Sequence, residues 1–266
     1  MKFWQFFKRE FFKRVRVKMY KTAYAYVQGR SHSKKNIPCQ DRVMSLTGKG
    51  VTVLSLADGA GSAKHSDIGA EIAVAEINQW LSELFKDLYK MNEEDLKWLL
   101  SEVILESLEK EATQRKIAFK ELSSTLLFVA VDSSKYLAGH LGDGIIGYMC
   151  SEGVETTIKV LSYPAKGEYH NSTFFTTASN LQEHLRIYKG SMNNVEGFIL
   201  MSDGAEESLF DRREKQFAPA VQRFFDWLND HSEEEVNQAL FKNLEKHICL
   251  KTQDDCSVGI LRRIKN

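Results

Sequence analysis

Aspartates stand at the ends of apolar runs in this sequence, where a β-strand would meet a turn. Asp58 directly follows the run VTVLSLA and precedes Gly59, and Asp203 follows the run FILMS and precedes Gly204. A single aspartate at a strand end is usually a turn former or a helix cap. Either position alone would therefore indicate only local structure, and it is the repetition along the chain that indicates chemistry.

Further carboxylates occupy comparable positions. They are Asp41 at the start of a strand-like run, Asp143 in the turn HLGDG, and the pair Asp254 and Asp255 just before the last apolar run. Like charges gathered at one edge of a sheet repel each other unless cations neutralise them. Carboxylate oxygens without Cys or His at ligand spacing favour Mg²⁺ or Mn²⁺ over zinc. The sequence therefore predicts a divalent-cation site where several strand ends meet.

Apolar periodicity divides the chain into the elements that must position these aspartates. The strand-like runs, joined by short turns, are 22–29, 41–47, 51–58, 124–132, 135–143, 145–150 and 256–264. The helix-like runs are 68–88, 96–108, 213–229 and 233–248. Strands with hairpin spacing, separated by pairs of helices, predict an α+β fold in which antiparallel sheets are flanked by helices.

Composition sets further expectations. The chain has 266 residues, of which 43% are hydrophobic, so it can bury the core of one large domain. Its formal net charge is zero, which argues against nucleic acid as a partner. The four cysteines are scattered, and no secretory leader or membrane-spanning run is evident. We therefore expect free thiols and a cytoplasmic protein.

The amino-terminal residues 1–21 differ from the rest of the chain. They carry eight Lys or Arg against one Glu, and Phe3, Phe7 and Phe11 recur at helical spacing. A basic, aromatic amphipathic helix can lie on a membrane surface or dock on an acidic partner. The alternative is a flexible extension with a solvated basic face. We treat 1–21 as an extension and 22–266 as the folded domain.

Six segments resemble the metal-dependent serine/threonine protein phosphatases of the type 2C family, in its divergent bacterial-type branch. They are QDR, LADGAGSAKHSDIGAE, ELSSTLLFVAV, HLGDG, ILMSDGAEE and DDCSVGIL, in the family's order, and they span roughly residues 29–263. The resemblance implies a four-layer α/β/β/α sandwich, with two antiparallel sheets and an antiparallel helix pair on each outer face. This agrees with the order of strands and helices expected above.

The resemblance also implies roles for particular residues. Asp58 would bridge two cations and Asp41 would hold a cation-bound water, so these two are the expected catalytic residues. The other expected metal ligands are Gly59 through its carbonyl, Asp203 and Asp254 at the first cation, and Asp143 at a weaker third. The implied cofactors are two Mn²⁺ or Mg²⁺ ions, with a third in some members of the family.

The activity implied is hydrolysis of phosphoserine and phosphothreonine on proteins. Two cations about 3.5–4 Å apart can lower the pKa of a shared water, and the hydroxide can attack phosphorus in line. No protein nucleophile is then needed, which agrees with the absence of a C-x5-R pattern. The partners implied are phosphoprotein substrates and a partner kinase or its targets.

Three departures from the family pattern affect this interpretation. Gln40 stands where many members have Glu, and Ala60 stands where animal members have a histidine proposed as the general acid. The arginine that grips substrate phosphate is not in register. Arg30, Lys34 and Lys35 are the available substitutes, and Arg30 is our first choice for phosphate binding.

Two other functions remain open on the sequence alone. The chain could be a catalytically silent binding or regulatory module that keeps the phosphatase fold. It could also hydrolyse small-molecule phosphates with the same pair of cations. Retention of Asp58, Asp203 and Asp254 together argues against the silent module, and a comparison of phosphopeptides with small phosphates would separate the remaining two.

Overall fold

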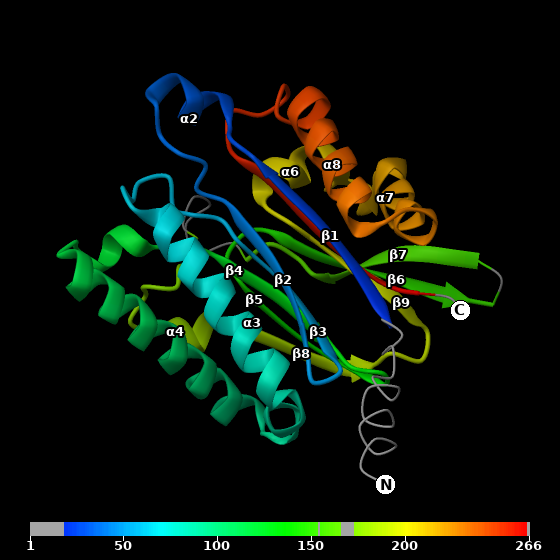
Figure 1. Ribbon diagram of the computed structural model, residues 1–266, viewed down its shortest axis with the longest axis horizontal. Helices are drawn as coiled ribbons and strands as arrows, with labels where there is room; N and C mark the ends of the chain where they lie inside the picture. Colours follow the sequence, from blue (N-terminus) through cyan, green and yellow to red (C-terminus); the bar gives the residue numbers. More distant parts are fainter. Residues whose placement is uncertain (1–18, 154, 166–172, 265–266) are drawn as a thin grey trace, which may run out of the picture.

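Two five-stranded antiparallel sheets lie face to face between two layers of helices in the computed structural model, which describes residues 19–153, 155–165 and 173–264 (Figure 1). The first sheet has the order β1 (Tyr20–Val27), β12 (Cys256–Arg263), β9 (Val195–Met201), β6 (Ile145–Glu152) and β7 (Glu155–Ser162). The second has the order β2 (Arg42–Gly48), β3 (Val51–Ala57), β4 (Leu126–Val131), β5 (Lys135–Leu141) and β8 (Arg186–Ser191).

The long helices form the outer layers. The pair α3 (Ser66–Lys90) and α4 (Glu93–Arg115) covers the second sheet, and the pair α7 (Pro219–Asp230) and α8 (Glu233–Asn243) covers the first (Figure 1). The shorter helices are α2 (Arg30–Lys35), η1 (Phe119–Leu122), α5 (Leu181–His184), α6 (Asp203–Leu209) and η2 (Leu244–Ile248). The α+β class and the four layers expected from the sequence are confirmed.

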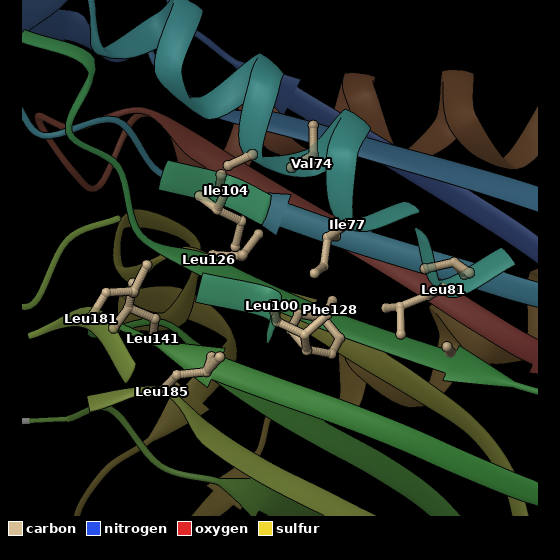
Figure 2. Close-up of a cluster of buried hydrophobic side chains, with 14 of the residues drawn as sticks. Val74, Ile77, Leu81, Leu100, Ile104, Leu126, Phe128, Leu141, Leu181 and Leu185 are labelled. Carbon is tan, nitrogen blue, oxygen red and sulfur yellow. The ribbon is translucent and has the colours of Figure 1, made fainter. Parts of the chain in front are cut away.

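Each junction between layers has its own apolar core. Between the second sheet and its helices, Ile77 of α3 and Leu100 of α4 lie beside Phe128 of β4 (Figure 2). A second cluster lies between the two sheets, and a third lies between the first sheet and α7–α8. Because both faces of each sheet are covered, central strands such as β3 are buried at every position.

The helix expected over 213–229 begins later, at Pro219, so this boundary was wrong. The preceding residues form a short hairpin of β10 (Phe210–Asp211) and β11 (Gln216–Phe217). Asp211 Oδ1 accepts hydrogen bonds from the backbone N–H groups of Arg213 and Glu214, at 2.8 and 3.0 Å. This turn competes with helix formation, and Pro219 then occupies the first turn of α7, where a missing N–H costs nothing.

Residues 1–18 lie outside the described residues, so the amphipathic helix and the division at 21/22 stay predictions. The first strand, β1, begins at Tyr20. Within the described part of the chain, no helix is both long and apolar enough to cross a membrane. All four cysteines are free thiols, as expected.

Truncation of Phe128 tests the core beneath α3 and α4. Phe128 is fully buried, and its ring occupies the space next to Gly139 on the neighbouring strand. We expect Phe128→Ala to lower the free energy of unfolding by about 3–5 kcal/mol, because it leaves a cavity that the sheet cannot close. Urea unfolding followed by circular dichroism measures this. Phe241→Ala, at a side chain that is 44% exposed, is the control and should cost well under half as much; equal losses would contradict the layer assignment.

Candidate functional site

The register of the first sheet brings three distant aspartates to one edge. Met201 at the end of β9 lies opposite both Val258 of β12 and Ile145 of β6. The segments that join these strands at that end therefore meet, although they are far apart in the sequence. The carboxylates that they carry are Asp143 before β6, Asp203 after β9 and Asp254 before β12.

The second sheet contributes two more carboxylates at the same end of the sandwich. Arg42 at the start of β2 lies opposite Ala57 at the end of β3, so Asp41 and Asp58 flank the same edge. The pKa of Asp58 is raised well above its usual value by burial and by the charges of the other four aspartates, Asp41 first among them. The five predicted carboxylates therefore act on one another across both sheets.

Backbone hydrogen bonds fix the loop that carries Asp58. The N–H of Asp58 donates to Thr125 Oγ1 at 2.9 Å, and the N–H of Thr125 donates to the Asp58 carbonyl at 2.8 Å. The next residues are tied similarly, since the N–H of Gly59 donates to the Gln40 carbonyl at 3.2 Å. None of these bonds uses the Asp58 carboxylate, which stays available to a cation.

Asp41 is the most deeply buried carboxylate of the site. It has no solvent exposure, and among the described residues neither of its carboxylate oxygens has a partner with hydrogen-bond geometry. Burial, followed by the charge of Asp255, raises its pKa to about 8. The pKa of Asp203 rises to about 6 through burial and the charges of Asp143 and Asp254, and one oxygen of Asp203 is likewise unpartnered.

This donor set fits hard divalent cations. A positive charge would stabilise carboxylates whose buried oxygens have no hydrogen-bond partners and which raise each other's pKa. Within the described ranges, no three Asp, Glu, His or Cys side chains are arranged so that they could hold a metal ion by themselves. Cations bound here would therefore take part of their coordination from water and from backbone carbonyls, as Mg²⁺ commonly does.

The adjacent Asp254 and Asp255 have different environments. Asp255 is buried and accepts hydrogen bonds from the backbone N–H groups of Gly29 and Gln40, both at 2.6 Å. Its Oδ1 also lies 2.9 Å from Nδ1 of the buried His32. Asp254 is exposed and lines an open cavity of about 380 Å³ together with Asp203. These contacts favour Asp254 as the cation ligand and give Asp255 a structural role.

Two glycines permit the close approach of backbones at this point. A Cβ at Gly204 would overlap the carbonyl oxygen of Asp255, and a Cβ at Gly29 would overlap the carbonyl group of Asp254. Any side chain at either position would push the segment 254–255 away from β9 and from the start of α2. The glycine after Asp203 therefore serves the packing of the site as well as the turn.

Arg30, the residue predicted to bind phosphate, is not among the residues that line this cavity, although it contacts Thr252, which does line it. Its Nε donates to the Thr252 carbonyl at 3.0 Å, and its side chain lines a separate groove beside α8. Lys251, which sequence reasoning did not select, lines the cavity that contains Asp203 and Asp254. Its position three residues before Asp254 was the only signal in the sequence.

Thr173 is a second residue that sequence reasoning did not select. Its hydroxyl donates to Asp143 Oδ2 at 2.6 Å and joins the loop before α5 to the site. This bond leaves the other oxygen of Asp143 for a cation. The role of Asp143 at a third cation stays a prediction.

Asp203→Asn tests the repulsion within the site. Because the pKa of Asp203 is raised in the folded state, that state binds more protons than the unfolded chain between about pH 4 and pH 6, so stability falls as pH rises there. Without divalent cations, we expect the variant at pH 8 to melt about 2–10 °C above the unmodified protein. The difference should vanish near pH 4.

Calorimetry in chelator checks this prediction, with Asp87→Asn as the control because the Asp87 side chain is 79% exposed. Mn²⁺ should then stabilise the unmodified protein more than Asp203→Asn. A lower melting temperature for Asp203→Asn at pH 8 in chelator would contradict the repulsion.

Comparisons with known proteins agree with this geometry. A curated relative, serine/threonine-protein phosphatase 3 of Escherichia coli (strain K12), is 24% identical over 226 residues, which cover 82% of this chain and 87% of the relative. The serine/threonine phosphatase from S. agalactiae superposes with a TM-score of 0.61 at 16% identity, covering 92% of this chain and 100% of that one. The serine/threonine phosphatase Stp1 from Staphylococcus aureus superposes with a TM-score of 0.60 at 13% identity, covering 93% of this chain and 96% of that one.

The structural similarities establish the fold, since both identities are low. The sequence profile of protein phosphatase 2C matches residues 28–245, which include four of the five converging aspartates. Asp254 follows the matched range and lies in the same cluster. The chain belongs to the protein phosphatase 2C family.

Proposed function

We propose that the protein hydrolyses phosphoserine and phosphothreonine on other proteins with the help of two divalent cations. The convergence of five carboxylates from both sheets, each separated from the next by long stretches of sequence, supports this most strongly. Family membership supports the same reaction. A silent binding module would have no need to keep buried, mutually repelling carboxylates, which lower stability in the absence of cations.

The residues of the site would divide the work as follows. Asp58, Asp203 and Asp254 would hold the cations, with the carbonyl of Gly59 as a further ligand. Bound there, two divalent cations would supply an activated water and neutralise charge on the phosphoryl oxygens. Asp41, whose oxygens have no strict hydrogen-bond partner within the described residues, would accept a hydrogen bond from that water and orient it.

The family pattern does not identify the group that protonates the leaving group in this chain, because Ala60 stands where animal members have the histidine proposed as the general acid. Two other histidines are already engaged: Nδ1 of His32 lies 2.9 Å from Asp255 Oδ1, and Nδ1 of His140 lies 2.8 Å from Ser162 Oγ. Burial, together with the charge of Arg186, lowers the pKa of His140 well below its usual value and keeps it neutral. A third histidine near the motifs, His65, lies with its Nε2 3.5 Å from Glu121 Oε2. With these three side chains engaged, we assign protonation of the leaving group to solvent.

The finer assignments from the sequence remain proposals. Phosphoproteins are the proposed substrates, and a kinase that shares those substrates is the proposed functional partner. Mn²⁺ and Mg²⁺ are the proposed ions, and the cytoplasm is the proposed location. Contact of residues 1–21 with a membrane surface or an acidic partner stays a prediction, because most of that segment lies outside the described residues.

Asp58→Asn should remove most of the activity while leaving the fold intact. The substitution removes the carboxylate expected to bridge the cations, so we expect a fall of at least about a hundred-fold in kcat/KM. The measurement is hydrolysis of p-nitrophenyl phosphate and of a phosphothreonine peptide by metal-stripped protein, titrated with Mn²⁺. Asp87→Asn is the matched exposed control, and turnover by Asp58→Asn at the rate of this control would refute the two-cation reaction.

Lys251→Ala tests which basic residue contacts the phosphate. Since Lys251 lines the cavity of Asp203 and Asp254, its loss should raise KM for p-nitrophenyl phosphate by about ten-fold and change kcat less. Arg30→Ala should change KM by less than about two-fold, because the Arg30 guanidinium is turned to the Thr252 carbonyl. A large rise in KM for Arg30→Ala, with little change for Lys251→Ala, would instead identify Arg30 as the phosphate-binding residue.

A further inference from the structure

An open groove of about 880 Å³ adjoins the site cavity. It lies between the end of α6, the hairpin β10–β11 and the start of α7. Glu207 of α6 lines both this groove and the smaller cavity that contains Asp203 and Asp254. The two depressions therefore lie next to each other and share Glu207 as a wall.

The groove lies at a distance that suits a polypeptide substrate. Asp203 and Glu207 are one turn apart on α6, which corresponds to about 6 Å along the helix axis. An extended peptide advances about 3.3 Å per residue. A chain whose phosphorylated residue sits at Asp203 and Asp254 would thus enter the groove about two residues away and could continue along it.

The walls of the groove are held in place by buried contacts. Arg212 Nε and Nη2 donate to Oε1 and Oε2 of the fully buried Glu206, both at 2.7 Å. The Phe217 ring stands over Gly147 of β6, only 2.6 Å from where a Cβ would be. These contacts fix the hairpin to α6 and to the first sheet, so a bound peptide would not have to order it.

Besides the acidic Glu207, Asp211 and Glu214, the lining offers two kinds of contact. Phe217 and the exposed Pro219 present apolar surface, and the Phe217 ring packs 5.0 Å from the ring of the buried Phe210. Arg213 stands at the rim with its side chain 93% exposed, and its nearest acidic atom, on Glu214, is 3.7 Å away. A weak, exposed ion pair of this kind is readily exchanged for a carboxylate on a ligand.

We propose that this groove binds the substrate polypeptide beside the phosphorylated residue, with an apolar side chain on Phe217 and Pro219 and an acidic side chain at Arg213. The assignment rests on the proposed phosphatase function and adds a preference for the substrate's flanking sequence. It places that preference on the hairpin β10–β11.

Two substitutions in the full-length protein test the groove. Gln216→Trp places a bulky ring in the groove from an exposed position, and Arg213→Glu reverses the charge at the rim. The matched controls, remote from the groove, are Gln114→Trp on α4 and Lys90→Glu at the end of α3. The substrates are phosphothreonine peptides with Leu and Glu at flanking positions, the same peptides with Gly instead, and p-nitrophenyl phosphate.

We expect Gln216→Trp to lower kcat/KM for the Leu-containing peptides by about ten-fold, mainly because KM rises. The kcat/KM for p-nitrophenyl phosphate should stay unchanged. Arg213→Glu should lower kcat/KM for the Glu-containing peptides by a similar factor. The control variants Gln114→Trp and Lys90→Glu should have the kinetic constants of the unmodified protein. Unchanged peptide kinetics in both variants, or an equal fall with p-nitrophenyl phosphate, would overturn the proposal. So would a change in oligomeric state of Gln216→Trp on size exclusion, which would assign the groove to contacts between copies.

Failure of the phosphatase function itself would look different. The unmodified protein would then fail to hydrolyse p-nitrophenyl phosphate with Mn²⁺ or Mg²⁺. The groove stays testable in that case, because fluorescence anisotropy of a labelled peptide with Leu and Glu reports binding without turnover. Loss of that binding in Gln216→Trp and Arg213→Glu supports the groove, and equal binding by all variants overturns it.

Discussion

Repulsion between carboxylates at one end of the sandwich is the constraint on which the rest of the structure depends. Burial raises the pKa of Asp58 most, and the charges of Asp41, Asp203, Asp254 and Asp143 raise it further. If side-chain hydrogen bonds held all of these carboxylates, their oxygens would already have partners. No oxygen would then remain to bind a cation. The chain instead positions them through backbone bonds and closely packed strands, and the three apolar cores supply the stability that the site lowers.

Asp255 shows how this division of roles works. Its carboxylate accepts hydrogen bonds from the backbone at Gly29 and Gln40, and it lies against His32. It thereby joins the segment before β12 to residues 29–32 and to Gln40, which directly precedes Asp41. Asp254, one residue earlier, stays exposed to the cavity. Two neighbouring residues of the same type therefore have different environments, one holding the loops and the other exposed to the cavity where we propose that cations bind.

Much of this arrangement could be predicted from the sequence, because strand ends and apolar periodicity are local signals. The five aspartates and the four layers follow from them and from the family resemblance. The sequence could not distinguish Asp254 from Asp255 by residue type, since their burial depends on tertiary contacts. It could not place Arg30 either, because the direction of a long side chain is set by packing and not by spacing along the chain.

The error at 213–229 has a physical cause that bears on function. The apolar periodicity there fits a helix, yet the Asp211 carboxylate accepts hydrogen bonds from two backbone N–H groups. These bonds favour the turn of a hairpin. A helix beginning at 213 would have left no walls for the groove beside Glu207. The proposed catalytic site and the proposed substrate groove are thus placed by different features, the first by the register of two sheets and the second by one local turn. The hairpin is anchored by the contacts of Arg212 with Glu206, by the Phe217 ring over Gly147 and by the buried Phe210, and none of these contacts uses one of the five converging aspartates.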